Sequence, residues 1–133
     1  VSKAELYSNH THIVFALSSF NNLVKNGRMS KIVGFVANKL GFWGIGIGSK
    51  QGTIEIKQKI RGSKKALDAI IDDMKERGYN CGKVVISHCR NAEFAESVKS
   101  AIQSVWDKAE VKIVHARGLC SYYAEKGGLI IGF

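Results

Sequence analysis

The sequence predicts an α/β fold, a mixed β-sheet of about six strands with helices packed on it. Apolar residues recur with a period of two in some segments and of about 3.6 in others, and these segments alternate along the chain. One pair of strand-like segments is joined by a short turn, which adds a hairpin to the strand–helix–strand units. A chain of 133 residues, 45% of them hydrophobic, has the size and composition of one globular domain. Residues 1–133 are therefore expected to form a single domain.

The first strand is expected at residues 12–17, a nearly continuous apolar run with β-branched members. A short helix should follow as far as Lys25, with the serines at 18–19 as its N-cap and Asn-Gly at 26–27 as its left-handed stop. Ser30 can cap a second helix. Its apolar residues cover most of its circumference and predict a well-buried helix: Ile32, Val33, Phe35, Val36 and Leu40.

Residues 42–59 are predicted to form a hairpin that turns at residues 50–52. On its first strand, large apolar residues alternate with Gly44, Gly46 and Gly48. Glycines in this pattern leave one face of the strand bare, which would let a ligand or a neighbouring backbone come close. Because they lie along a strand rather than between a strand and a helix, they do not predict a nucleotide site.

The return strand of this hairpin is predicted to have two different faces. One face is apolar, interrupted by Gln58, and consists of Ile54, Ile56 and Ile60. The other face is charged and consists of Glu55, Lys57, Lys59 and Arg61. Its three cations would form a basic strip along the strand.

Two amphipathic helices are expected in the second half of the chain, one at residues 63–77 ended by Gly78, and one capped by Asn91. The apolar stripe of the first consists of Leu67, Ile70, Ile71 and Met74. The stripe of the second consists of Phe94, Val98, Ala101, Ile102 and Val105. The remaining strands are predicted at 83–87, 111–114 and 128–133, with a loop or a short helical turn at 118–126.

The formal charge of +9 favours an anionic partner, which could be nucleic acid, an anionic surface or an acidic protein. The chain opens at Val1, so we also expect a fragment, whose missing part could balance this charge. No apolar run reaches the ~18 residues of a membrane helix, and the first residues do not resemble a signal peptide. Cys81, Cys89 and Cys120 match no metal-binding spacing and are expected as free thiols, which predicts a cytoplasmic protein.

No residue pattern predicts catalysis, a metal or a cofactor. His88 and Cys89 end a strand just before a helix, where α/β proteins often place functional groups. No second residue completes a catalytic triad with them, so a capping or surface role is favoured for His88. His10 and His12 would point to one face of a strand, but they lack a third ligand, and no metal is expected.

Two arginines stand at predicted turns. Arg28 follows the helix stop at 26–27, and Arg61 directly precedes Gly62 and a helix. A planar guanidinium held at a turn suits the recognition of a carboxylate or phosphate. The alternative of equal weight is a pair of solvated surface charges.

Four segments follow the order and spacing of known family patterns. They are Leu23-Val-Lys-Asn-Gly-Arg-Met-Ser30, Lys50-Gln-Gly52, Lys59-Ile-Arg-Gly-Ser-Lys-Lys-Ala66 and Ala124-Glu-Lys-Gly-Gly-Leu-Ile-Ile-Gly-Phe133. The corresponding patterns are L-x-x-G-G-R-I-S, K-D-G, K-V-R-x-x-K-K-A and H-x-G-P-G-x-L-G-x-x-F. Together they span nearly all of the chain, which thus resembles the C-terminal domain of the DegV proteins, the bacterial fatty-acid-binding proteins.

This resemblance implies half of a two-domain protein that holds a long-chain fatty acid and presents its carboxylate to a fatty-acid kinase for phospholipid synthesis. The chain would be a ligand-binding subunit rather than an enzyme. Its implied partners are the fatty acid, an N-terminal DegV domain and the kinase. By the motif match, Arg28 and Arg61 take the places of arginines near the ligand head and the kinase-facing surface.

The closing segment departs from the family pattern. Tyr123, which follows Ser121 and Tyr122, takes the place of the family histidine that contacts the carboxylate, and we assign Ser121 and Tyr123 to the ligand with the two arginines. A tyrosine hydroxyl can donate one hydrogen bond to a carboxylate, but it does not titrate near neutrality as histidine does. Residues 125–126, Glu-Lys, replace the family's Gly-Pro.

Two other functions are weighed against lipid binding. The basic strip of Lys57, Lys59 and Arg61, beside Phe42 and Trp43 on the neighbouring strand, would suit an RNA-binding module. An enzyme that uses His88 or Cys89 ranks last, because neither has a base–nucleophile partner. The resemblance favours the fatty acid over nucleic acid.

Overall fold

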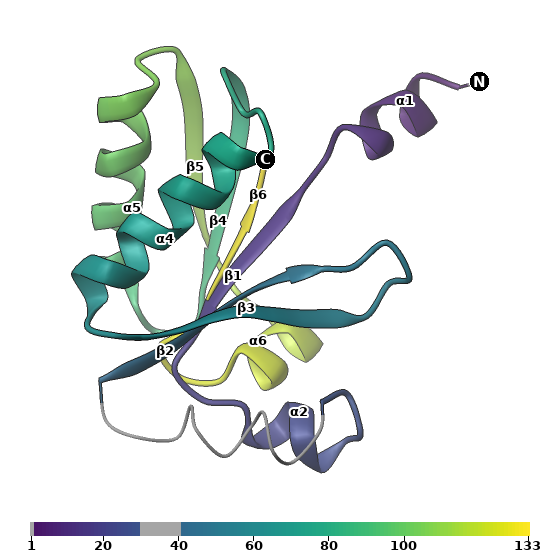
Figure 1. Ribbon diagram of the computed structural model, residues 1–133, viewed down its shortest axis with the longest axis vertical. Helices are drawn as coiled ribbons and strands as arrows, with labels where there is room; N and C mark the ends of the chain where they lie inside the picture. Colours follow the sequence, from purple (N-terminus) through teal and green to yellow (C-terminus); the bar gives the residue numbers. More distant parts are fainter. Residues whose placement is uncertain (1, 30–40) are drawn as a thin grey trace.

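The strands form one six-stranded sheet in the order β3-β2-β1-β6-β4-β5, in a computed structural model that describes residues 2–29 and 41–133 (Figure 1). The strands are β1 (Ile13–Leu17), β2 (Phe42–Gly48), β3 (Ile54–Arg61), β4 (Gly82–His88), β5 (Ala109–His115) and β6 (Leu129–Gly132). β4 and β5 are parallel, and the other neighbouring strands are antiparallel. The predicted mixed α/β sheet is confirmed. The helix expected after Ser30 falls outside the described residues.

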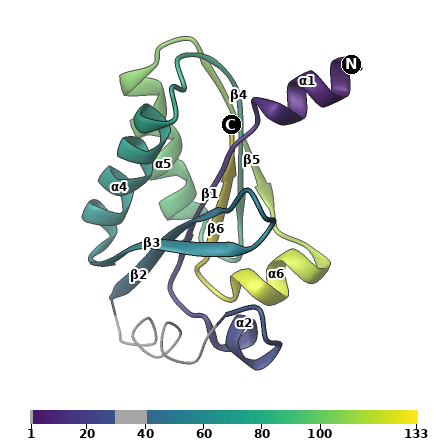
Figure 2. The ribbon, with the colours of Figure 1, turned by 45° about the vertical axis from the view of Figure 1, so that its right-hand side comes forward.

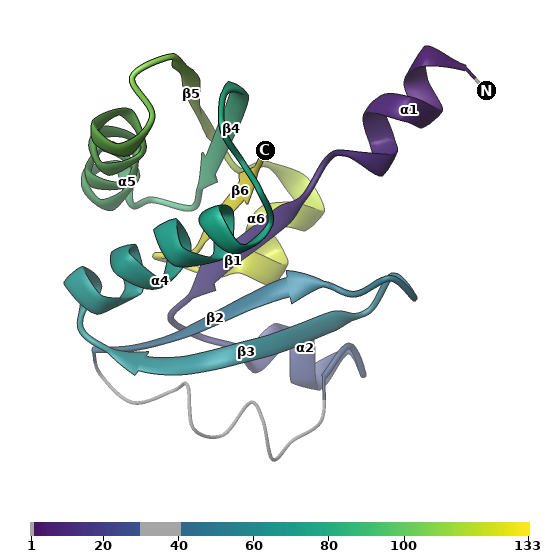
Figure 3. The same ribbon diagram turned by 45° about the horizontal axis from the view of Figure 1, so that its top comes forward.

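Among the residues that the structure describes, helices cover the two faces of the sheet unequally. α4 (Ser63–Glu76) and α5 (Ala92–Val105) lie along one face, while the short helices α2 (Asn21–Lys25) and α6 (Gly118–Ala124) lie at one end of the other (Figures 1 and 3). We call this second, partly covered side the open face. α1 (Lys3–Asn9) projects from the sheet and buries none of its residues (Figure 2). Among residues 2–29 and 41–133, no helix is long and apolar enough to cross a membrane.

The main core lies between the sheet and the pair α4 and α5. Its fully buried members on the two helices include Ile70, Met74, Val98 and Ile102. Each such side chain contributes roughly 1.5–3 kcal/mol by leaving water. Val105, predicted in the same stripe, is 45% exposed instead. The next residue, Trp106, packs against the core in its place, with its ring in an edge contact with Tyr79.

α1 was not expected from the sequence, although the sequence carries its start signal. Ser2 Oγ accepts a hydrogen bond from the Glu5 backbone N–H (3.2 Å), and the Glu5 carboxylate accepts one from the Ser2 N–H (2.8 Å). This reciprocal capping box satisfies two backbone donors that the first turn of a helix leaves free. Residues 3–9 show no amphipathic pattern in the sequence, because no face of α1 is buried.

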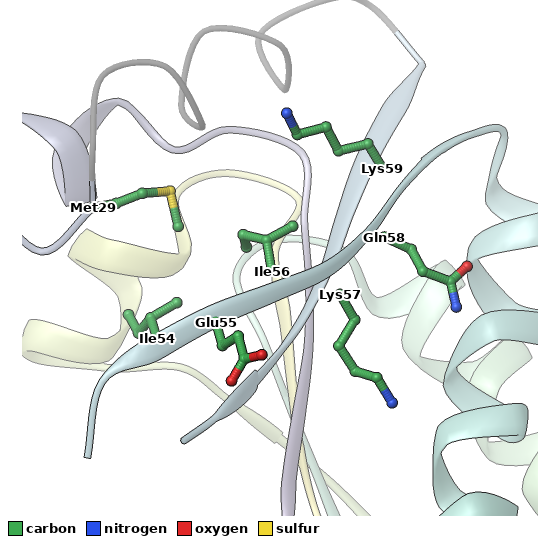
Figure 4. A pocket seen from close by; sticks show the side chains of 7 residues that line it. All are labelled: Met29, Ile54, Glu55, Ile56, Lys57, Gln58 and Lys59. Carbon is green, nitrogen blue, oxygen red and sulfur yellow. The ribbon is translucent and has the colours of Figure 1, made fainter. Parts of the chain in front are cut away.

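A β-bulge in β3 overturns the two faces predicted for this strand. The pairing passes from Ile45–Gln58 to Gly46–Ile56, so Lys57 is an extra residue in the ladder. Beyond the bulge the alternation is reversed: Ile56 packs on the open face, and Ile60 packs under α4. The prediction of a basic strip formed by Lys57, Lys59 and Arg61 is therefore wrong. Figure 4 shows Lys57 and Lys59 pointing to opposite sides of the strand.

The bulge residue is held by a buried carboxylate. Lys57 Nζ donates to Asp73 Oδ1 and to Glu76 Oε2, each at 2.9 Å. Arg77 Nε lies 3.1 Å from the other oxygen of Asp73, close enough for an ion pair but outside hydrogen-bond alignment. The Asp73 side chain is only 3% exposed, and a buried carboxylate needs such partners to remain charged. The hydrogen bonds from Lys57 to Glu76 and Asp73 raise the pKa of Lys57, and Lys57 lowers the pKa of Glu76.

Replacing Asp73 with Asn should lower the free energy of unfolding by about 2 kcal/mol, since hydrogen bonds to charged groups contribute about 1.5–3 kcal/mol each. Urea denaturation measures the loss, and Asp72→Ala, at an exposed position of the same helix, is the control. Equal losses of stability in Asp73→Asn and Asp72→Ala would contradict the anchoring role of Asp73.

The stability of the wild-type protein should also depend on pH. It should weaken as the pH falls through the lowered pKa of Glu76, and again as the pH rises through the raised pKa of Lys57.

Candidate functional site

A second apolar cluster lies on the open face, between the sheet and the short helices α2 and α6. Its buried members are Phe15, Leu17, Phe20, Leu23 and Ala124. Beyond the two helices the same face exposes Ile13 (46%), Ile54 (37%) and Val85 (43%). A contiguous apolar surface of this kind marks a site for a ligand or a partner. The open face is therefore the candidate binding surface.

The glycines of β2 make room for this cluster. A Cβ atom built on Gly44 would lie 2.3 Å from a ring carbon of Phe20, and one built on Gly46 would lie 2.4 Å from a ring carbon of Phe15. This strand face was predicted to be bare. The prediction is wrong at Gly44 and Gly46, because the rings of Phe20 and Phe15 fill the space there. At Gly48 nothing lies within 4 Å, so only this position is open to another molecule.

A cavity of about 590 Å³ runs along β3, the edge strand. Met29, Ile54, Ile56 and Lys59 point to its open-face side, whereas the side chains of Glu55, Lys57 and Gln58 point away toward α4 (Figure 4). Apolar walls with a small number of polar groups are typical of sites for small organic ligands. This arrangement fits an amphiphile with a long apolar part and an anionic group.

Arg28 is positioned by the way α2 ends. Gly27 has a φ of +68°, its N–H donates to the Val24 carbonyl (3.1 Å), and the Arg28 N–H donates to the Leu23 carbonyl (2.8 Å). This Schellman motif confirms the predicted helix stop and fixes the direction in which the chain leaves it. The Arg28 guanidinium carbon lies 5.9 Å from the ring centre of Tyr123. Two of the predicted site residues are therefore brought together at the junction of α2 and α6.

Ser121 lies on α6 near the same junction. Its hydroxyl donates to the Gly118 carbonyl (2.8 Å), and its carbonyl accepts from the Cys89 thiol (3.8 Å). The hydroxyl oxygen still has acceptor capacity, but its proton is used within the helix. Cys81, Cys89 and Cys120 are all free thiols, as predicted.

Arg61 stands apart from the other three predicted residues. It pairs with Phe42 across the hairpin, and its guanidinium carbon lies 5.9 Å from the Phe42 ring centre. Its position is the end of β3 that leads into α4, away from α6 (Figure 1). The predicted set thus forms two groups: Arg28, Tyr123 and Ser121 near the junction of α2 and α6, and Arg61 at the far end of the edge strand.

Glu125 is a site residue that the sequence did not reveal. Its carboxylate accepts from the Ser19 hydroxyl (2.9 Å) and from the Asn22 backbone N–H (3.1 Å). The N-cap predicted at 18–19 is therefore wrong, since the carboxylate that caps the first turn of α2 comes from the end of the chain. Asn22 also donates to the Tyr122 carbonyl (2.8 Å), which ties α2 to α6 a second time. Because Glu125 lies so far along the chain from Ser19 and Asn22, no local sequence pattern could predict these hydrogen bonds.

His88 is neither the cap nor the surface residue favoured from the sequence: the N-cap of α5 is Asn91, as predicted, and His88 is a buried residue that bonds to it. Its Nδ1 accepts from the Asn91 backbone N–H (3.1 Å), which leaves the proton of the neutral ring on Nε2. The ring is buried, and its centre lies 4.6 Å from that of His115 on the parallel strand β5. Burial, with His115, lowers the pKa of His88. Within the described part of the chain, no group of three or more His, Cys, Asp or Glu residues could hold a metal ion.

Replacing Glu125 with Ala should loosen α2 from α6, because the substitution removes a helix cap and a long-range hydrogen bond together. We expect the free energy of unfolding to fall by about 1–2 kcal/mol, the usual cost of a lost cap. Amide hydrogen exchange at Asn22 should accelerate. Glu96→Ala, on the exposed side of α5, is the control, and unchanged exchange at Asn22 would contradict the capping role.

Comparison with known proteins relates this site to a family. The family model described as "uncharacterised protein, DegV family" matches residues 1–133. A DegV domain-containing protein of Streptococcus pyogenes is 41% identical over 133 residues, which cover 100% of this chain and 48% of the relative. One of Streptococcus pneumoniae is 39% identical over 127 residues, covering 96% and 45%. The chain thus spans about half the length of the curated relatives it matches.

Solved structures show the same fold. A DegV family protein of Eubacterium eligens, loaded with heptadecanoic acid, is 38% identical, with a TM-score of 0.93 over 96% of this chain and 46% of that protein. The fatty acid kinase B3 protein of Streptococcus pneumoniae, loaded with linoleic acid, is 39% identical, with a TM-score of 0.93 over 97% of this chain and 46% of that protein. With a family model that matches its whole length, this chain belongs to the DegV family.

Proposed function

We propose that this chain binds a long-chain fatty acid on its open face, as half of a larger fatty-acid-binding protein. The observation that carries the proposal is the uneven cover of the sheet. α2 and α6 shelter the cluster around Phe15 and leave Ile13, Ile54 and Val85 exposed on the same face. A methylene chain laid on this surface would remove apolar area from water, which is the main driving force for such binding. The relatives loaded with heptadecanoic and linoleic acid support this ligand class.

The head group is assigned to the junction of α2 and α6. The planar fork of Arg28 suits a carboxylate, and the Tyr123 hydroxyl can donate one further hydrogen bond. The Ser121 hydroxyl is a third candidate contact, although its proton is used by Gly118. Arg61, at the other end of β3, is assigned to the surface that faces a partner kinase. In this proposal the chain presents the fatty acid and does not itself catalyse a reaction.

The complete protein is proposed to contain a second, N-terminal domain and to act with a fatty-acid kinase. The relatives are about twice as long as this chain, which supports a further domain. The pneumococcal relative is a fatty acid kinase B3 protein, which supports a connection with such a kinase. The cytoplasmic location expected from the free thiols stays a prediction.

RNA binding loses its structural basis. The proposed basic strip required three cations on one strand face, but the bulge places Lys57 on the α4 side, where Asp73 and Glu76 pair with it. Only Lys59 and Arg61 remain together on the open face. Of the two rings in that hypothesis, Phe42 lies beside Arg61, whereas Trp43 packs against Phe94 and the main core and offers no free face for a base.

Organic extraction of the complete purified protein should recover a long-chain fatty acid at close to one per molecule. Each buried methylene contributes roughly 0.8 kcal/mol, so a long acyl chain outweighs the several kcal/mol that association costs. Mass spectrometry identifies the lipid, and the isolated chain should retain less of it. A lipid-free protein that binds single-stranded RNA with a steep salt dependence would contradict the proposal.

Lysine in place of either arginine should weaken phosphoryl transfer to the bound fatty acid by about tenfold, because lysine keeps the charge but loses the bidentate fork. Arg28→Lys should lower the affinity for the fatty acid. Arg61→Lys should instead raise the concentration of kinase needed, with lipid content unchanged. Arg117→Lys, at an exposed arginine, is the control. Phosphoryl transfer at the wild-type rate in both variants would contradict the roles proposed for Arg28 and Arg61.

A further inference from the structure

Two turns at one end of the sheet, residues 88–91 and 125–128, contain unusual backbone conformations, and we call this pair of turns the clasp. Among the residues that the structure describes, only two that are not glycine have a positive φ: Arg90 at 52° and Glu125 at 57°. Glu125 also has a ψ of 173°, close to a region that is essentially confined to glycine. Such conformations cost free energy and persist only where the surrounding structure holds them.

The two turns of the clasp are fastened to each other by hydrogen bonds. The Gly127 N–H donates to the Cys89 carbonyl (2.8 Å), and the Cys89 N–H donates to the Gly128 carbonyl (2.9 Å). The Asn91 side chain adds a third bond, in which its Nδ2 donates to the Gly127 carbonyl (3.0 Å). The turn that contains Glu125 is therefore held by the turn that leads into α5.

The Asn91 side chain bonds in two directions. Its Oδ1 accepts from the Phe94 backbone N–H (3.4 Å) and caps α5, while its Nδ2 crosses to the other turn of the clasp. The Asn91 backbone is fixed as well, because its N–H donates to His88 Nδ1 (3.1 Å). One residue thus links the start of α5 to the segment that contains Glu125.

Glu125 carries this constraint to the junction of α2 and α6. Its carboxylate accepts from the Ser19 hydroxyl and the Asn22 N–H, and at the same junction Arg28 lies beside Tyr123. Both acceptor positions depend on the direction in which the Glu125 side chain leaves its backbone. A relaxed backbone, with a negative φ, would send the carboxylate elsewhere.

We propose that Asn91 is a positioning residue for the head group: its bond to Gly127 holds Glu125 in the conformation that caps α2. This inference rests on the proposed function, which assigns Arg28 and Tyr123 to the carboxylate of the fatty acid. Without the bond, Glu125 relaxes in a fraction of the molecules, and α2 is uncapped in that fraction. The apparent affinity falls with the fraction that remains competent to bind. Asn91 itself touches no ligand.

Replacing Asn91 with Asp separates the two roles of this side chain. Aspartate keeps a capping oxygen for α5 but cannot donate to the Gly127 carbonyl. The complete protein with Asn91→Asp should bind palmitic acid about fivefold more weakly, the equivalent of one typical hydrogen bond. Amide hydrogen exchange at Asn22 should accelerate. Asn80→Asp, the same change at an exposed position between α4 and β4, is the matched control and should alter neither quantity.

A second variant removes the same bond without adding a charge. Asn91→Ser also keeps a capping oxygen, but it lacks the amide nitrogen that reaches the Gly127 carbonyl. Its loss of affinity for palmitic acid should match that of Asn91→Asp.

A double-mutant cycle tests whether Asn91 acts through Glu125. Glycine adopts a positive φ without strain and has no carboxylate, so in Glu125→Gly the clasp has no strained cap to hold. Asn91→Asp should therefore cause no further loss of affinity for palmitic acid in the Glu125→Gly background.

The other outcomes separate this inference from the proposed function. A wild-type protein that binds no palmitic acid overturns the proposed function and this inference with it. A wild-type protein that binds palmitic acid, with unchanged affinity in Asn91→Asp, overturns the inference alone. A loss of equal size in the Glu125→Gly background also overturns it, because Asn91 would then act independently of Glu125. So does a loss in Asn91→Asp that Asn91→Ser does not share, since the added charge would then be the cause.

Discussion

The sheet has to support two apolar layers at once, and the glycine side of β2 is the constraint on which the second layer depends. One face of β2 contributes Ile45 to the core under α4 and α5. The other has no side chains at Gly44 and Gly46, and the rings of Phe20 and Phe15 occupy that space. With any side chain at these positions the rings would have to move away from the sheet. The lack of side chains at Gly44 and Gly46 therefore allows the rings of Phe20 and Phe15 to lie directly against the sheet.

The bulge at Lys57 makes the same face amphiphilic. It adds one residue to β3, and this shift of parity brings Lys59 and Arg61 to the side on which Ile54 and Ile56 lie. The extra residue is satisfied on the opposite side, where its ammonium meets the buried carboxylate of Asp73. A regular strand would have separated apolar and basic residues onto two faces. The irregular one places an apolar groove and two cations on one surface.

The junction of α2 and α6, the proposed head-group end of the open face, is assembled from segments far apart in the chain. Glu125, near the C-terminus, caps α2 through Asn22, and Tyr123 lies against Arg28, which the end of α2 orients. α2 is only one and a half turns long, and so short a helix has little stability of its own. Its contacts with the α6 region hold it in place. The position of the proposed carboxylate contacts, Arg28 and Tyr123, thus depends on the same junction that supports the apolar cluster.

The sequence by itself determined the elements whose signals are local. The β-branched run before Leu17, the helical stripe that ends at Gly78, and the cap at Asn91 all appear in the structure, because periodicity and backbone preference act over a few residues. The motif match likewise identified the family. The tertiary structure alone decided which face each residue of β3 occupies, what fills the glycine recesses, and that Glu125 caps α2. These features depend on pairing register and on contacts between residues up to about a hundred positions apart, and no local window of the sequence contains both partners.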